Sequence, residues 1–266
     1  MRVLGKVLPV SFALVALFAV ALPGAFSQDG SAGNLHPAAE QLFALANQTR
    51  AQSGAGPLQW DPALAAAALY HCRRMAQEGP IAHRYGGEPD LAGRAGQAGA
   101  HFSLIEENVA VGSSADRIHS MWMQSPGHRE NMLNPEVDRV GVAVVESRGV
   151  LYAVADYARD VQTLSASQVE ARVAQLIKVR GISIVRDPSL ARRACTTSEG
   201  MPGSAGGAVP GFLMRWQGAD LNQLPKVLAD KLDSGRYRRA AIGSCPAQDL
   251  DGAFTAYRMA VLLYFE

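Results

Sequence analysis

The chain has 266 residues, of which 48% are apolar, and 25 Lys and Arg stand against 24 Asp and Glu for a formal net charge of +1. This length allows one or two domains, each with a sizeable core. The near-neutral charge gives no electrostatic reason to expect a nucleic-acid partner.

The N-terminus has the pattern of a signal peptide. Arg2 and Lys6 precede an apolar run over 7–22, and Ala25-Phe26-Ser27 offers a small-residue cleavage site. We therefore expect a signal peptide over 1–27, a flexible lead over 28–37, and a secreted or periplasmic protein with no transmembrane segment after cleavage. The alternative, an uncleaved anchor, is disfavoured because the run is short for a membrane span.

The next segment predicts helices followed by a strand pair. A helix over 38–52 ends before Gly54, and a second helix begins at Asp61-Pro62 and ends at Gly79-Pro80. A third helix follows Ser113-Ser114. Strands over 139–145 and 150–157 are joined by a polar turn. Helices followed by an antiparallel pair predict an α+β fold.

A Ser-Pro-Gly-His run after Trp122 is the most informative local pattern. Ser125 fits an N-cap and Pro126 the first helical position, which places His128 in the first turn of a short helix. The positive end of the helix dipole disfavours imidazolium there, so a neutral ring is available as a metal ligand, a base or a hydrogen-bond partner. The alternative is a capped helix start whose histidine is only a polar surface residue. Ser125 is disfavoured as a nucleophile because its hydroxyl is expected to cap the backbone.

Two further residues point to the same region. Glu107 lies in an otherwise apolar stretch, so its carboxylate is expected to be partly buried and to need a partner. His83 follows the Gly79-Pro80 helix stop and precedes a glycine-containing loop.

These pieces together resemble one family, the CAP superfamily (cysteine-rich secretory, antigen 5, pathogenesis-related 1), in its bacterial secreted form. The matching pieces lie in order between residues 38 and 157: Asn47-x-x-Arg50, Leu58-Gln59-Trp60, the helix from Leu64 to Met75, His83, Glu107-Asn108, the run from Trp122 to Asn131, Val140-Gly141-Val142-Ala143, and Tyr152-Ala153-Val154-x-Asp156-Tyr157. The resemblance implies a CAP domain over 38–160 with an α-β-α sandwich, in which helices flank a small antiparallel sheet.

The resemblance also implies a site of two histidines and two acids, of which His83, His128 and Glu107 are present. The position expected for the second acid holds Arg94. Two imidazoles and a carboxylate can hold zinc with a bound water, so His83 and His128 are candidate metal ligands. A guanidinium would repel a cation and is expected to form a bidentate pair with Glu107 instead. His71, His101 and His119 are interpreted as surface or helix-flank residues.

Two functions follow from this site. The preferred one is a non-enzymatic binding module for a small, lipidic or peptide ligand or a cell-surface component, with a cleft lined by His83, Arg94, Glu107, Asn108 and His128. The alternative is a zinc hydrolase or peptidase in which Glu107 serves as general base beside His128. The chain contains neither G-x-S-x-G nor H-E-x-x-H, which argues against an α/β-hydrolase and a helix-borne zincin site.

The three cysteines predict one disulfide. Cys72 shares a helical face with Leu64 and Met75 and is expected to be a buried thiol. Cys195 and Cys245 then pair by default.

The segment over 165–266 predicts a smaller α+β domain. It contains a helix over 167–179, a Gly- and Pro-rich loop over 200–211, an amphipathic stretch over 221–232 and a terminal strand over 254–264. Asp187-Pro188 echoes Asp61-Pro62, and Gly243 before the last strand echoes Gly141. We interpret this domain as either a degenerate copy of the first or an unrelated appendage, with a second recognition surface or a lid as its role.

Overall fold

The computed structural model describes residues 35–197, 199–200, 209–248 and 254–265. The predicted signal peptide and residues 28–34 of the predicted lead lie outside these residues. Within the described ranges, no helix is long and apolar enough to cross a membrane.

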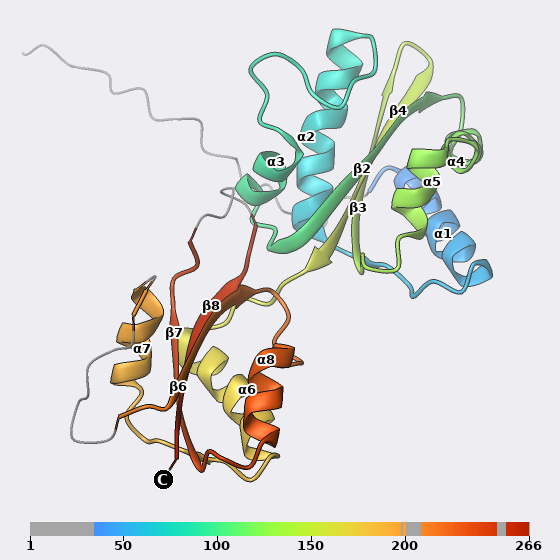
Figure 1. Cartoon of the computed structure of the whole chain (residues 1–266). Coiled ribbons are helices and arrows are strands. Elements are labelled where there is room, and N and C mark those ends of the chain that lie inside the picture. The colour runs from blue at the N-terminus through green and yellow to red at the C-terminus, as the bar shows by residue number, and fades with distance from the viewer. Residues whose placement is uncertain (1–34, 198, 201–208, 249–253, 266) are drawn as a thin grey trace, which may run out of the picture. The chain divides into compact units, whose positions relative to one another are not determined.

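The first lobe, residues 37–160, is a three-layer arrangement of helices and one sheet. Its elements in chain order are α1 (Pro37–Gln52), β1 (Gln59–Trp60), α2 (Pro62–Glu78), α3 (Leu91–Gln97), β2 (Phe102–Gly112), α4 (Ala115–Gln124), α5 (Pro126–Leu133), β3 (Arg139–Ser147) and β4 (Val150–Asp160). The strand order is β1-β3-β4-β2, with β4 antiparallel to both β3 and β2. Figure 1 shows α2 and α3 on one face of this sheet and α1, α4 and α5 on the other. The predicted α+β sandwich is confirmed, although the sheet is mixed because β1 pairs parallel with β3.

Local sequence signals set the helix and turn positions. The Asp61 carboxylate accepts from the Ala63 and Leu64 amides at 2.7 and 2.9 Å, and Pro62 occupies the first turn of α2. Between β3 and β4, Arg148 and Gly149 have φ of +54° and +76°. Two successive residues with positive φ form the type of tight turn that matches the twist of a hairpin. These predicted boundaries are therefore close to the observed ones.

Gly141 allows α2 to lie directly against the sheet. A Cβ at this position would approach the Ala65 nitrogen to 2.0 Å and the Leu64 carbonyl carbon to 2.2 Å. Only a residue without a side chain permits this contact between strand and helix backbone. The rest of α2 then packs along the sheet through buried side chains such as Cys72 and Met75.

The opposite face of the sheet is packed against α1, α4 and α5. Trp122 is 1% exposed, and its indole N–H donates to the Val109 carbonyl at 3.2 Å. Arg50 is also 1% exposed and donates to four backbone carbonyls. These are the carbonyls of Gly56, Met132, Asn134 and Val137. Arg50 therefore ties α1 to the end of α5 and to the segment that leads into β3, which fixes the position of α5.

The second lobe, residues 166–264, has the same order and direction of strands. Its elements are α6 (Ala166–Lys178), β5 (Ser183–Ile184), α7 (Ser189–Thr196), β6 (Phe212–Gly218), α8 (Lys226–Asp233), β7 (Arg239–Cys245) and β8 (Tyr257–Tyr264). The order is β5-β7-β8-β6, with β5 parallel to β7 and β8 antiparallel to both of its neighbours. Figure 1 shows α7 on one face and α6 and α8 on the other. The shared topology is compatible with the predicted copy, which stays a prediction.

Details of the second lobe agree in part with the sequence. The predicted helix over 167–179 is α6, whereas the amphipathic stretch over 221–232 is helical only from Lys226. Cys195 and Cys245 form the predicted disulfide, and Cys72 is a buried free thiol. Burial raises the pKa of the Cys72 thiol to about 12, so it is not a reactive thiolate near neutral pH.

Candidate functional site

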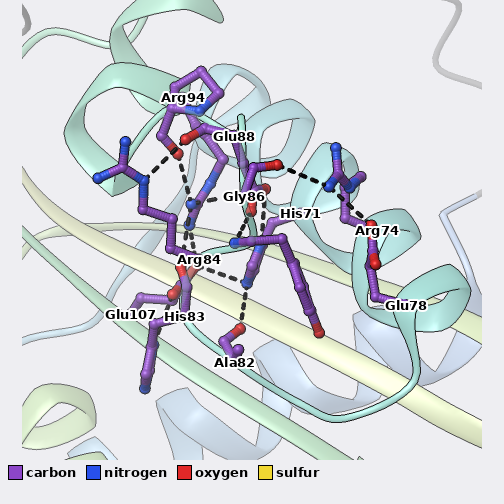
Figure 2. Close-up of polar contacts among 12 residues, drawn as sticks. His71, Arg74, Glu78, Ala82, His83, Arg84, Gly86, Glu88, Arg94 and Glu107 are labelled. Carbon is purple, nitrogen blue, oxygen red and sulfur yellow. Dashed lines mark hydrogen bonds and ion pairs between the residues drawn. The ribbon is translucent and has the colours of Figure 1, made fainter.

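A loop and an edge strand bring His83 and Glu107 together. Gly79 ends α2 with φ of +105°, and the loop that follows carries His83 to β2. The His83 Nδ1 lies 2.8 Å from the Glu107 Oε1, and their side chains are 59% and 3% exposed. A buried carboxylate thus holds an imidazole that solvent can reach (Figure 2). The hydrogen bond to Glu107 raises the pKa of His83, and burial opposes this effect.

Arg94 pairs with Glu107, as the sequence predicted. The Arg94 Nη2 donates to the Glu107 Oε2 at 2.5 Å, and the Arg94 side chain is 1% exposed. The predicted bidentate geometry is not observed, because Nη1 points to the carbonyls of His83 and Pro89 instead, each at 3.3 Å. Arg94 therefore neutralises the buried carboxylate and also holds the loop that carries His83.

His71 is buried, and its interpretation as a surface or helix-flank residue was wrong. It is fully inaccessible on α2, where its Nδ1 lies 2.8 Å from the Glu88 Oε1 and its Nε2 lies 2.8 Å from the Ala82 carbonyl oxygen. Both ring nitrogens therefore face oxygen atoms of the protein. The signal was present in the sequence, because His71 follows Leu64 by seven positions and Ala67 by four on the core face of the helix.

Glu88 is the second buried carboxylate on this side of the sheet. Its Oε2 accepts from the Tyr85 amide at 2.9 Å, and its Oε1 also lies 3.8 Å from the Arg94 Nη1. Figure 2 shows His71, Glu88, Arg94 and Glu107 grouped next to His83. Sequence reasoning did not assign Glu88 to the site, because its contacts depend on the path of the loop between α2 and α3.

Asp156 completes this group, and sequence reasoning did not identify it as a site residue. It lies opposite Glu107 across β2 and β4 and is fully buried. Neither of its carboxylate oxygens meets an amide, hydroxyl or cationic donor among the described residues, and the Glu107 carboxylate is its hydrogen-bonding neighbour. Burial, and secondarily the charge of Glu107, raise the pKa of Asp156 well above the ordinary range, which favours its neutral form. The alternation of Tyr152, Val154 and Asp156 along β4 was the available signal. His71, Glu88, Arg94, Glu107 and Asp156 are called the buried charge cluster below.

His128 lies in the first turn of α5, where the sequence placed it. The centroids of the His83 and His128 rings are 6.3 Å apart. Burial, and secondarily the charge of His83, lower the pKa of His128, which favours the neutral ring that the sequence predicts, with burial rather than the helix dipole as the leading cause. Ser125 occupies the N-cap position, but its side chain makes no capping bond, contrary to the expectation.

Asn108 supports the site from the opposite face of β2 instead of lining a cleft. It is fully buried, and its Nδ2 donates to the His128 carbonyl at 2.8 Å. Asn131, which was quoted only as the end of a motif, donates to the Glu107 carbonyl at 3.1 Å and to the Asn108 Oδ1 at 3.0 Å. The two amides therefore attach the first turn of α5 to β2. Of the five predicted cleft residues, only His83 and His128 are accessible to a ligand.

The remaining predicted polar residues lie apart from these contacts. His101 is exposed and His119 is half-buried against Thr49. The Glu106 carboxylate accepts from the Asn134 side chain at 3.0 Å, and burial raises its pKa.

The residues of the site do not make up a complete zinc centre. A catalytic zinc ion takes three protein ligands and a water. His83 and His128 supply two imidazoles, but both Glu107 oxygens are engaged, one with His83 and the other with Arg94. Across the described ranges, no group of three or more His, Cys, Asp or Glu side chains is placed to hold a metal. The guanidinium of Arg94 also disfavours a cation beside Glu107.

Comparison with known proteins concerns the first lobe. The model of the cysteine-rich secretory protein family (CAP) matches residues 43–157. The uncharacterised protein YkwD of Bacillus subtilis is 30% identical over 115 residues, which make up 42% of this chain and 44% of that relative.

Two solved structures of the same kind are similar to part of the chain. An extracellular protein from Bacillus anthracis that contains an SCP domain is 26% identical, covers 48% of this chain and 45% of its own, and has a TM-score of 0.44. A cysteine-rich secretory protein from Staphylococcus aureus is 20% identical, covers 49% and 41% of the two chains, and has a TM-score of 0.41. The chain therefore spans less than half the length of each of these relatives.

Proposed function

We propose that residues 43–157, which match the CAP family model, form a bacterial CAP domain and that the chain is a binding protein, which takes a small, lipidic or peptide ligand at the surface formed by His83 and His128. The observation that carries this proposal is the placement of two accessible imidazoles over the buried charge cluster. Burying several ionisable groups together is costly and contributes little net stability. Its benefit is to hold the His83 loop in one geometry before a ligand arrives, while Asn108 and Asn131 hold α5.

The two imidazoles favour a ligand with an acidic oxygen. The Glu107 contact promotes the imidazolium form of His83, whereas burial keeps His128 neutral. An imidazolium donates from both ring nitrogens, and a neutral imidazole donates from one and accepts at the other. Because His83 Nδ1 faces Glu107, its Nε2 is left for the ligand. A carboxylate or phosphate head group matches this arrangement through charge-assisted hydrogen bonds.

We also propose that the protein is secreted or periplasmic. The apolar run over 7–22 and the small residues at the predicted cleavage site support export. The Cys195–Cys245 disulfide suits an oxidising compartment. Protein recovered from the medium or periplasm should begin near Gln28 by N-terminal sequencing, and retention of residues 1–27 would refute cleavage.

The binding proposal is tested by calorimetry with palmitate, with acetate as the bare carboxylate and with a capped tripeptide. For any probe that the wild type binds, His83→Ala and His128→Ala should each weaken binding at least about tenfold, since each removes one charge-assisted or neutral hydrogen bond. His101→Ala, an exposed histidine outside the site, is the matched control and should bind like the wild type. Equal affinity in all four proteins, or no binding of any probe, would contradict the proposal.

Heats from palmitate but not acetate would identify the ligand as lipidic. Melting temperatures of the same variants separate binding from folding. If His128→Ala loses affinity and thermal stability in parallel, His128 has a structural role and the proposal fails for that residue.

The alternative function, a zinc hydrolase or peptidase with Glu107 as base, has weaker support. His83 and His128 are near one another, but the described residues offer no third zinc ligand. Zinc titration of the wild type beside His83→Ala/His128→Ala tests it directly. Micromolar binding that the double variant loses would favour the hydrolase, and the absence of site-dependent heat would eliminate it.

A further inference from the structure

One end of the second lobe combines basic and exposed apolar side chains. Main-chain and side-chain contacts place its parts together. The Ser183 amide donates to the Arg238 carbonyl, and the Arg238 amide donates to the Tyr264 carbonyl, each at 2.9 Å. The Arg180 Nε donates to the Asp233 carboxylate at 3.1 Å and so joins the ends of α6 and α8. The C-terminal ends of both helices, the start of β7 and the end of β8 therefore form one surface, called the basic end below.

The basic end carries a local excess of positive charge. Its exposed cations are Lys178, Arg180, Lys231, Arg236, Arg238 and Arg239. Among the described residues 178–183, 231–239 and 264–265, Asp233 is the only acid, and it pairs with Arg180. The whole chain has almost equal numbers of positive and negative side chains. The excess at this end is therefore a property of the surface and not of the composition.

Helix dipoles explain only part of this excess. Lys178 and Lys231 lie in the last turns of α6 and α8, where a cation stabilises the helix terminus. Arg236, Arg238 and Arg239 follow α8 in the loop and at the start of β7, outside any helix. Three cations in four consecutive residues thus have no role in capping α8.

Apolar side chains are exposed among these cations. Val179 is 81% exposed and Phe265 is 48% exposed. The Phe265 ring stacks on Tyr237 with centroids 5.0 Å apart, and the Arg236 guanidinium lies 5.9 Å from its centroid. The Lys231 ammonium lies 5.6 Å from the Phe212 ring, and the Arg239 guanidinium lies 5.7 Å from the Tyr264 ring. Lys231, Arg236 and Arg239 therefore lie beside aromatic rings, and the Phe265 ring is half open to solvent.

We propose that the basic end docks on an anionic lipid bilayer, with Arg236 and Arg238 at the phosphate level and Phe265 and Val179 in the interfacial region. Clustered Lys and Arg are attracted to anionic head groups, and neighbouring aromatic and aliphatic side chains enter the boundary with the acyl chains. Charge complementarity selects an anionic surface, and the exposed apolar residues favour a bilayer over a hydrated polyanion. This surface is separate from the His83 and His128 site and does not depend on the proposed ligand binding.

The test is sedimentation with vesicles of phosphatidylcholine alone and of phosphatidylcholine with 30% phosphatidylglycerol. All proteins lack residues 1–27, because that apolar run would bind vesicles by itself. We expect binding to the anionic vesicles only, weakened at high salt. Arg236→Glu/Arg238→Glu should lose at least about tenfold in affinity, since each basic residue near such a surface contributes about 1 kcal/mol. Arg73→Glu/Arg117→Glu, which reverses two exposed arginines of the first lobe, is the matched control and should bind like the wild type.

Phe265 separates a bilayer from a dissolved polyanion. Phe265→Ala should weaken vesicle binding. Phe265→Trp should preserve it, and the tryptophan emission that it adds to that of the wild type should shift to the blue on anionic vesicles. Equal loss in the two arginine variants would show that total charge acts and would overturn the proposal. Binding to heparin or single-stranded DNA in solution without binding to vesicles would overturn it in favour of a soluble polyanion. Binding to phosphatidylcholine alone that equals binding to anionic vesicles would also contradict it.

Discussion

Glu107 and Asp156 face one another across β2 and β4, beneath the imidazole of His83. Two ionised carboxylates cannot be buried side by side without strong repulsion, so one of them must hold a proton. Glu107 has Arg94 and His83 as partners, whereas Asp156 meets no amide, hydroxyl or cationic donor among the described residues. Asp156 is therefore the better place for a proton, while the Glu107 carboxylate keeps its contacts with Arg94 and His83.

Replacing Asp156 by Asn should change how stability depends on pH. The folded-state pKa of Asp156 is raised, so its contribution to stability is complete below the ordinary pKa and is lost as pH rises toward the folded value. Over that window the loss is about 1.4 kcal/mol per pH unit. Asp156→Asn removes this loss, because a neutral amide of similar shape does not ionise. In denaturant unfolding, the free energy of unfolding of Asp156→Asn should increase relative to that of the wild type as the pH rises from 4 to 8.

Other ionisable groups face Asp156 in both proteins. They are Glu107, Arg94, Cys72 and Tyr157. Since these are common to the wild type and Asp156→Asn, the difference between the two proteins isolates Asp156. Glu146→Gln, which changes an exposed carboxylate, should leave the pH dependence unaltered. Parallel curves for Asp156→Asn and the wild type would mean that Asp156 is ionised in the folded protein.

The pKa of His83 should lie above that of an ordinary histidine, and the pKa of His128 should lie below it. Glu107 raises the pKa of His83, whereas burial lowers that of His128. The His83 contribution to stability is therefore present at low pH and lost as pH rises through its folded pKa, and that of His128 is present at high pH and lost as pH falls. Proton NMR of the imidazole C–H signals should place the midpoint of His83 above that of His128. Glu107→Gln should lower the His83 midpoint, and an unchanged midpoint would show that Glu107 does not hold the charge.

Removing Arg94 should strongly destabilise the first lobe. Arg94→Met leaves Glu107 buried without its cation, which costs about 3–5 kcal/mol in comparable buried pairs. Arg94→Met/Glu107→Gln removes both charges and should recover part of this loss in a urea unfolding experiment at pH 7. The exposed change Arg73→Met should alter the free energy of unfolding by no more than about 0.5 kcal/mol. A double variant that is no more stable than Arg94→Met would contradict the pairing.

Both strand glycines that contact helix backbones should be intolerant of alanine. A Cβ at Gly141 would overlap α2, and a Cβ at Gly243 would approach the Ala191 carbonyl carbon and the Arg192 nitrogen of α7 to 2.2 Å. Each alanine variant should lose at least about 1–3 kcal/mol, the usual cost of overpacking. Gly127→Ala in α5, where a Cβ meets nothing within 4 Å, is the control and should be neutral or slightly stabilising. Melting temperatures that fall in all three variants would show that the backbone contact is not the cause.

The helix boundaries of the first lobe could be predicted because their signals are local. Asp61, Pro62 and Gly79 act on residues within one turn, so their roles follow from the sequence alone. The edge strand β2 was not predicted as a strand, since Glu106, Glu107 and Asn108 interrupt its apolar pattern. Those polar groups are accommodated by Arg94, Asn131 and Asn134, which come from other elements. Their partners cannot be read from neighbouring residues.

The sequence identified some residues of the site and missed others. His83, His128, Glu107 and Arg94 were identified through the resemblance to one family, although Glu107 and Arg94 are buried. Asp156 and the His71–Glu88 pair became evident only when the loop between α2 and α3 was placed against the sheet. The helical period of α2 indicates that His71 faces inward, and the alternation along β4 indicates the same for Asp156. These two patterns predict burial correctly where the polar character of the side chains does not.

The second sheet offers an internal reference for the first. Gly141, Asp156 and Glu107 lie side by side across β3, β4 and β2, and Gly243, Ala260 and Arg215 occupy the corresponding row of β7, β8 and β6. The row in the second sheet keeps the glycine that admits a helix but has no carboxylate, and Arg215 instead donates to the Ala194 carbonyl at 2.6 Å. One scaffold geometry thus occurs twice in a single molecule, with and without the acidic pair. Acidic side chains placed at Ala260 and Arg215 would test whether the sheet framework alone, or the surrounding side chains as well, produce the environment that His83 meets in the first sheet.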